Sequence, residues 1–302
     1  MTTALQQRRI AFSFDESTPY MWLPSRPEFA HLTNLFSILA IGLERFIVAT
    51  MREAMPLIGD VDVRDEADGF LRQEARHAAA HVRHLKALFA QYPELQDVLD
   101  ESNAAWDRLT TEALHYRLAF IAVLEGTFTP FFKVFLDNQD VFFAPGDDRV
   151  ASLFLWHFIE EVEHRSSSSV VYDEIVGRRW YRAATFPKAL YQSAQIVFTI
   201  ARGIDRVVPE SERRVSAVDS VKTAGGTTAL STRLLRRRAG RPDMLAGVPT
   251  RQVLRMIYRE LRAQVPGNDP THQPLPAYAD VWLGAYERGV DVTRWYTGHV
   301  EP

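Results

Sequence analysis

The sequence contains no cysteine, and this absence excludes several classes of site at once. Disulfide bonds, cysteine-bound zinc, iron–sulfur clusters and thiolate nucleophiles all need the sulfur atom of that residue. A chain without disulfides suits a reducing compartment, so we expect a cytoplasmic protein. Any metal centre in this chain must therefore be built from carboxylates and imidazoles.

The chain also lacks a large excess of charge, a long uncharged apolar run and a signal-like start. Its 302 residues carry a net charge of −3, which gives no reason to expect nucleic acid or a membrane surface as a partner. The most apolar stretches, 34–51 and 118–136, both contain charged residues. We interpret them as buried helices and expect no membrane span. Residues 1–17 contain no apolar signal core.

Alternation of apolar and polar residues is almost absent, so the sequence predicts an all-α protein. Four long helices are expected, over 25–58, 62–91, 105–137 and 148–176. Residues 94–104 are predicted to form a short helix or connector, and Pro130 is predicted to kink the third long helix.

Two stretches each place three metal-binding side chains on one helical face. In WHFIEEVEHR at 156–165, these are His157, Glu161 and His164, at positions i, i+4 and i+7. In QEARHAAAHVRH at 73–84, they are Glu74, His77 and His81, at positions i, i+3 and i+7. Each stretch therefore contains a Glu-x-x-His pair, and the two pairs together are half of a dinuclear carboxylate site.

The other half of such a site is one Glu from each of two further helices. Glu44 and Glu125 are the candidates, since each lies on an otherwise apolar face of the first or third long helix. An unpaired carboxylate there would cost several kcal/mol, and a bound dication removes that cost. We therefore predict a ferritin-like four-helix bundle that binds two metal ions. The expected ligands are Glu44, Glu74, His77, Glu125, Glu161 and His164, with His157 and His81 in addition.

The roles of several residues in or near the expected ligand set can be interpreted in more than one way. His157 and His81 are either further ligands or hydrogen-bond partners that orient a ligand, and the alternative is that each lines the bundle with a backbone partner. Glu160 competes with Glu161, because it lies four residues before His164. Asp173 either hydrogen-bonds a ligand histidine from the bundle interior or is a surface charge. Thr129, one turn from Glu125, is expected beside the metals.

These patterns divide the chain into three parts. Residues 1–24 are predicted to form an N-terminal arm packed on the surface, and residues 25–177 the dimetal-binding bundle. Residues 178–302 are predicted to add further helices, which pack on the bundle or at the subunit interface of a homodimer. These helices are expected at 186–208, 249–264 and 277–294, with a loop at 209–229. We interpret the basic run at 231–241 as a solvated face or subunit contact, with anion binding as the alternative.

The motifs resemble those of the family of predicted metal-dependent hydrolases. The matching residues are Gly42 shortly before Glu44, Gln73 to His81, Glu125, and Trp156 to His164, and the resemblance covers about residues 20–176. The site is also similar to that of ferritin-like di-iron oxygenases. The triplet His157, Glu161 and His164 resembles the histidine-rich variant in the arylamine N-oxygenases, which implies a third histidine ligand at His157.

Three functions are compatible with such a site. The sequence favours a di-iron oxidase or oxygenase that uses O₂ and an electron donor to oxidise a small organic substrate, because a bundle core is dry. The alternative is a hydrolase in which the metal activates a water molecule. The third is a ferritin-like protein that stores or binds iron without catalysis. Iron is the expected metal, with manganese or zinc as alternatives.

Overall fold

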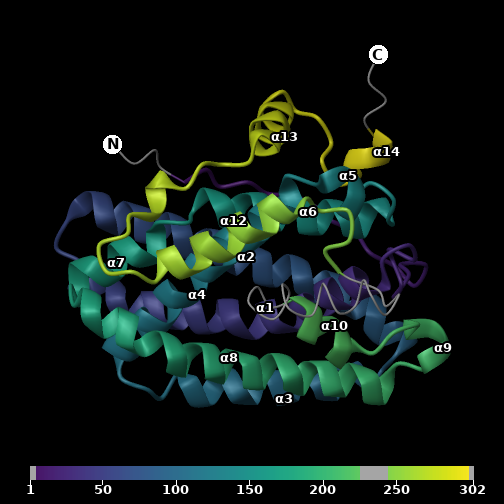
Figure 1. Ribbon diagram of the computed structural model, residues 1–302, viewed down its shortest axis with the longest axis horizontal. Coiled ribbons are helices and arrows are strands. Elements are labelled where there is room, and N and C mark those ends of the chain that lie inside the picture. Colours follow the sequence, from purple (N-terminus) through teal and green to yellow (C-terminus); the bar gives the residue numbers. More distant parts are fainter. Residues whose placement is uncertain (1–4, 225–243, 299–302) are drawn as a thin grey trace.

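The computed structural model describes residues 5–224 and 244–298, and all its regular elements in these two ranges are helices, with no strand among them (Figure 1). The predicted all-α class is confirmed. The basic run at 231–241 lies outside the described residues.

Four helical segments surround the candidate site. They are α1 (Pro27–Ala54), α2 (Val61–Gln91), α4 (Leu114–Leu136), and α6 (Asp148–Glu163) followed by α7 (Ser167–Ile175). Helix α1 packs against α2 and α4, and α6 and α7 pack against the same two helices. A 3₁₀ turn, η1 (Met55–Leu57), follows α1. Each of the four segments that carry a predicted ligand therefore contacts at least two of the others.

Local sequence signals set the starts of α1, α2 and α6. Pro27 occupies the first turn of α1, where its missing N–H leaves no bond unmade. The carboxylate of Asp60 caps α2 by accepting hydrogen bonds from the main-chain N–H groups of Asp62 at 2.8 Å and Val63 at 3.2 Å. Asp147 caps α6 in the same way. The predicted helices at 25–58 and 62–91 agree with α1 and α2 to within a few residues.

The third and fourth predicted helices need correction. The prediction at 105–137 merged the end of a separate helix, α3 (Leu95–Leu109), with α4, because the turn at 110–113 contains neither glycine nor proline to mark it. The prediction at 148–176 is divided, since α6 ends at Glu163 and α7 begins at Ser167. Four consecutive serines at 166–169 favour such a break, because their hydroxyls compete with the helical backbone for hydrogen bonds.

The described C-terminal part packs against the same helices. Helix α8 (Arg179–Val207) contacts α3 and α4, and α12 (Thr250–Ala263) contacts α4. Figure 1 shows α3 and α8 side by side along one edge, with α13 (Ala277–Glu287) at the opposite edge. The smaller elements are α5 (Gln139–Phe142), α9 (Glu210–Arg213), α10 (Ala217–Ala224), η2 (Pro270–His272) and α14 (Trp295–Gly298). Helices α9 and α10 lie where the sequence predicted a loop.

The N-terminal arm inserts into the interior instead of resting on the surface. Phe12 and Trp22 are buried, and the ring of Phe12 lies 5.4 Å from that of Trp156 on α6. The indole N–H of Trp22 donates to the hydroxyl of Thr33 at 2.9 Å. The arm therefore belongs to the core, and it brings Arg8 into the protein interior.

Two segments are long and apolar enough to cross a membrane, Pro27–Leu57 and Leu114–Leu136. In each, 78% of the most apolar window is buried inside the protein. Burial of this extent is typical of the core helices of a globular fold, in agreement with the interpretation of the two apolar stretches in the sequence.

Gly42 allows α1 and α3 to approach closely. A Cβ atom at this position would lie 2.2 Å from Cδ1 of Trp106, which is itself buried. We expect Gly42→Ala to lower the free energy of unfolding by about 1–3 kcal/mol through overpacking. Urea unfolding measures this change, with Gly284→Ala as control, because the nearest atom there is the flexible end of Arg288. Equal effects of the two substitutions would contradict the close packing of Gly42 against Trp106.

Candidate metal centre

Seven carboxylate and imidazole side chains meet in the interior between α1, α2 and α6. Four groups of three have ligand atoms within 4.8 Å of one another. The groups are Glu44 with His81 and His157, His77 with His157 and Glu161, Glu44 with Glu74 and His77, and Glu74 with Glu161 and His164. All seven residues are buried. This set, called the cluster below, contains seven of the eight ligands predicted from the sequence.

Around His164, ligand atoms approach one another without forming hydrogen bonds. Its Nδ1 lies 3.3 Å from Oε1 of Glu74, and its Nε2 lies 3.4 Å from Oε1 of Glu161. Both oxygens of Glu74 and both nitrogens of His164 have no hydrogen-bond partner in residues 5–224 and 244–298. Buried polar atoms are rarely left in this state. A cation beside Glu74 would satisfy its carboxylate together with one nitrogen of His164.

Glu161 is at the centre of the cluster. Its Oε1 atom lies 3.0 Å from Nε2 of His157 and 3.6 Å from Nδ1 of His77, in addition to its contact with His164. Nε2 of His157 is also 3.8 Å from Oε1 of Glu44. One carboxylate thus faces three imidazoles from two helices, as a residue shared between two metal positions would do.

Glu160 supports the cluster from outside. Its Oε2 accepts a hydrogen bond from Nε2 of His77 at 3.0 Å, which leaves Nδ1 of His77 turned towards Glu161. Oε1 of Glu160 accepts from the guanidinium of Arg8 at 3.0 Å, and Arg8 also bonds Glu163 at 2.7 Å. The structure therefore separates the two competing glutamates, with Glu161 in the cluster and Glu160 behind His77. Sequence reasoning missed Arg8, because nothing local links an irregular arm to α6.

His81 orients His157. Nε2 of His81 and Nδ1 of His157 are hydrogen-bonded at 2.8 Å, so Nε2 of His157 is left to face Glu161. Nδ1 of His81 contacts the hydroxyl of Ser37 at 2.9 Å, and the same hydroxyl contacts Nδ1 of His84 at 2.9 Å. Both ring nitrogens of His81 are thus hydrogen-bonded to other side chains. Ser37 was also missed, since a single serine in an apolar helix carries no recognisable signal.

Three further residues predicted at the site, Glu125, Thr129 and Asp173, do not belong to the cluster. Glu125 is buried, and its Oε2 lies 4.0 Å from Nε2 of His164, at the edge of the cluster. The hydroxyl of Thr129 donates to the main-chain carbonyl of Glu125 at 3.0 Å, so it bonds the backbone and not the carboxylate. Asp173 is exposed on α7, which agrees with a surface charge, the second of its two interpretations, and not with a hydrogen bond to a ligand histidine. The break after α6 changes the helical register, so Asp173 does not continue the face of His164.

The electrostatics of the cluster favour a cation. Burial raises the pKa of Glu44 and of Glu74 well above the usual value, and repulsion from Glu161 and Glu125 adds to the effect. Burial and the charge of Glu161 raise the pKa of Glu125 to about 8. Burial lowers the pKa of His164, but the carboxylates of Glu161 and Glu125 outweigh it and raise the value to about 9. Without a bound cation, the carboxyl groups of Glu44, Glu74 and Glu125 therefore favour their protonated form.

Because of these shifts, the metal-free protein should become less stable as the pH rises from 6.5 to about 9. The folded state keeps protons on Glu125 and His164 that the unfolded chain releases, so its stability falls as the pH rises through both folded pKa values, about 8 and about 9. Burial lowers the pKa of His157 to about 4, so this residue adds no opposing slope above its ordinary value of 6.5. Urea unfolding in the presence of a chelator measures the trend. A rise in stability over this range would contradict it.

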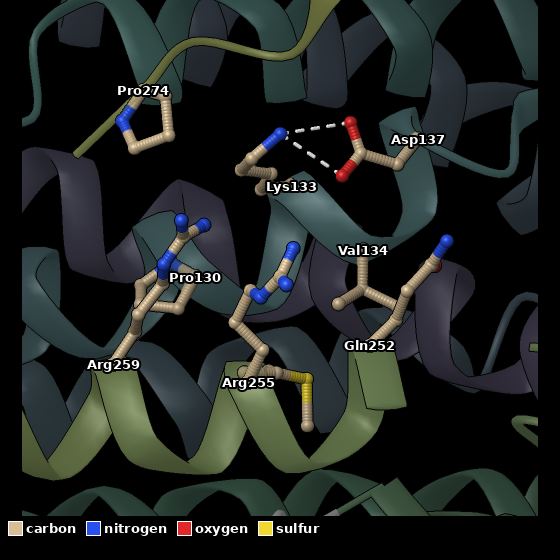
Figure 2. A pocket seen from close by; sticks show the side chains of 9 residues that line it. Pro130, Lys133, Val134, Asp137, Gln252, Arg255, Arg259 and Pro274 are labelled. Carbon is tan, nitrogen blue, oxygen red and sulfur yellow. Dashed lines mark hydrogen bonds and ion pairs between the residues drawn. The ribbon is translucent and has the colours of Figure 1, made fainter. Parts of the chain in front are cut away.

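Two surface pockets differ in their relation to the cluster. One, between α1, α2 and α3, has a volume of about 520 Å³ and is lined in part by Glu44. The other lies between α4 and α12 and is lined by Lys133, Arg255 and Arg259, among others (Figure 2). Lys133 is paired with Asp137 there at 2.8 Å. No cluster residue lines this second pocket, so the first one is the candidate route to the site.

The chain was also compared with known proteins and protein families. No curated protein and no solved structure matched the chain. A family model described as predicted metal-dependent hydrolase matches residues 6–244, a range that includes Arg8 of the N-terminal arm and every residue of the cluster. The chain therefore belongs to the family of predicted metal-dependent hydrolases.

Proposed function

We propose that the cluster binds two metal ions and that the protein hydrolyses an ester, amide or phosphate bond of a small organic substrate. The observation that supports this most is the set of buried ligand atoms without hydrogen-bond partners in the described residues. They are both oxygens of Glu74, one oxygen each of Glu44 and Glu125, Nδ1 of His77 and both nitrogens of His164. Such atoms cost free energy unless a cation binds them. The family described above gives the type of reaction.

The donors fit two neighbouring ions. Glu74, Glu161 and His164 would hold one, with Glu125 beside it. Glu44 would hold the other together with His77, with which it shares one ligand group, or with His157, with which it shares another. Carboxylates and imidazoles without thiolates suit iron, manganese or zinc. Single glutamates on α1 and α4 and Glu-x-x-His pairs on α2 and at the end of α6 correspond to the ferritin-like four-helix arrangement, which we propose for this bundle.

When bound, such ions supply Lewis-acid activation of water and of the scissile bond. The chain prepares the site for this chemistry. Glu160 fixes the orientation of His77, and His81 fixes that of His157, so each imidazole presents one nitrogen to the cluster. The rings of Phe36, 5.1 Å from His157, and Phe70, 4.9 Å from His164, limit access of bulk water.

The same apolar surroundings favour a second candidate, an O₂-dependent oxidase or oxygenase. Reactions of O₂ at a metal need protection from bulk water, and the cluster is buried beside Phe36 and Phe70. This function would require iron and an external electron donor. It shares the metal site with the hydrolase and differs in metal preference and in its need for O₂.

One experiment separates the candidates. Metal-free protein is reloaded with zinc, manganese or Fe(II), and metal content, hydrolysis of p-nitrophenyl esters and phosphates, and O₂ uptake with a reductant are measured. The hydrolase predicts zinc- or manganese-dependent hydrolysis without O₂, lost in Glu161→Gln and kept in Asp173→Asn. O₂ uptake with iron alone and no hydrolysis with any metal would overturn it in favour of the oxidase. Many irons per chain with neither activity would indicate storage.

A further inference from the structure

The groove between α1, α2 and α3 meets the cluster at one residue. Glu44 lines the groove, and its carboxylate also belongs to the cluster. On α2, the groove is lined by Ala75 and Ala78, which directly follow the cluster residues Glu74 and His77. The volume of about 520 Å³ lies within the range of sites for small organic ligands.

The walls of this groove are apolar. Ala49 from α1 and Ala75 and Ala78 from α2 have only methyl side chains, which leaves space between the two helices. Trp106 of α3 lies against the groove, and its indole N–H is buried without a hydrogen-bond partner in the described residues. The walls therefore suit an apolar body.

Two arginines line the groove, together with one aspartate, Asp107. Arg45 and Arg52 lie on α1 seven residues apart, on the same helical face. Arg45 pairs with Asp107 at 3.3 Å, and both side chains are more than half exposed, so this pair is weak. Arg52 is exposed and makes no ion pair with any residue of 5–224 or 244–298. Its guanidinium is therefore available to a ligand.

We propose that this groove admits the substrate and that the substrate is an organic carboxylate. Arg52 would bind the carboxylate group, the apolar body would lie against Ala75 and Ala78, and the reacting bond would face Glu44. Arg52 follows Glu44 by eight residues, and a rise of about 1.5 Å per residue separates them by about 12 Å along α1. This distance suits an elongated molecule. The inference names the substrate class of the proposed hydrolase and therefore rests on that function.

Binding of 4-phenylbutyrate to the full-length, metal-loaded protein tests the inference by calorimetry, with the neutral 4-phenylbutyramide for comparison. Arg52→Gln should weaken carboxylate binding about 10-fold, as expected for loss of one charged contact, and leave amide binding unchanged. The control Arg83→Gln changes an exposed arginine of α2 outside the groove and should have no effect. Ala75→Trp and Ala49→Trp, at exposed positions of two different helices, should each abolish binding by filling the groove.

Metal content per chain is measured in every variant and should not change. If the wild-type protein binds no metal, the proposed hydrolase function fails, and carboxylate binding in the groove is still measured with the same variants. If metal binds normally but 4-phenylbutyrate does not bind, or binds equally to wild type, Arg52→Gln and both tryptophan variants, the inference is overturned and the hydrolase remains.

Discussion

Glu74→Gln should remove most of the metal from the protein, with a loss of affinity of about 100-fold or more. Loss of residues that merely support a ligand costs about 10–100-fold, and a direct ligand should cost at least as much. Glu74 belongs to two of the four ligand groups, and both of its oxygens lack a hydrogen bond in the described chain. Metal analysis and competition with a chelator measure the change.

The same substitution should stabilise the metal-free protein, because it removes a buried carboxylate that lacks a partner. Asp173→Asn is the matched control, since it changes an exposed acidic residue that the sequence had linked to the site. Its metal content should equal that of the wild type. Full metal content in Glu74→Gln would show that this residue is not a ligand.

Arg8→Met should lower the free energy of unfolding by about 3–5 kcal/mol, which is the usual cost of removing one partner of a buried ion pair. Arg8 and Glu160 are only 2% and 1% exposed, and their atoms lie 3.0 Å apart. The substitution would leave Glu160 buried with only His77 as its partner. We also expect weaker metal binding, because Glu160 sets the orientation of His77.

Urea unfolding and metal titration measure the two effects of Arg8→Met. Arg9→Met is the control, since Arg9 is the exposed neighbour in the same arm. Arg8→Met combined with Glu160→Gln should recover part of the lost stability, because the second substitution removes the unpaired charge. A change of less than about 1 kcal/mol in Arg8→Met would contradict a structural role for this pair.

The sequence predicted the composition of the cluster well, because its signals are local. Glu74 and His77, and Glu161 and His164, are three residues apart, and this spacing alone places each pair on one side of the backbone. Glu44 was recognisable as a charge in an apolar helix, and the structure brings it within reach of His157 at 3.8 Å. The all-α class followed from the same helical periodicity.

The supporting contacts could not be predicted, because they join distant segments. Arg8 and Glu160 are 152 residues apart in the chain, and Ser37 and His81 are 44 apart. Neither pair has a local pattern. The two interpretations of Asp173 stayed open for a different reason, since the sequence predicted one continuous helix through the serines at 166–169, whereas the chain leaves the helix at His164.

The most direct test of a metal centre in this cluster is anomalous diffraction from crystals of the metal-loaded protein, recorded at the absorption edge of the bound metal. We expect two peaks between α1, α2 and α6. One peak should lie about 2.0–2.2 Å from Glu74, Glu161 and His164, as carboxylate and imidazole ligands require. An absence of peaks in the cluster, with Glu74 and His164 bonded only to water, would contradict this expectation.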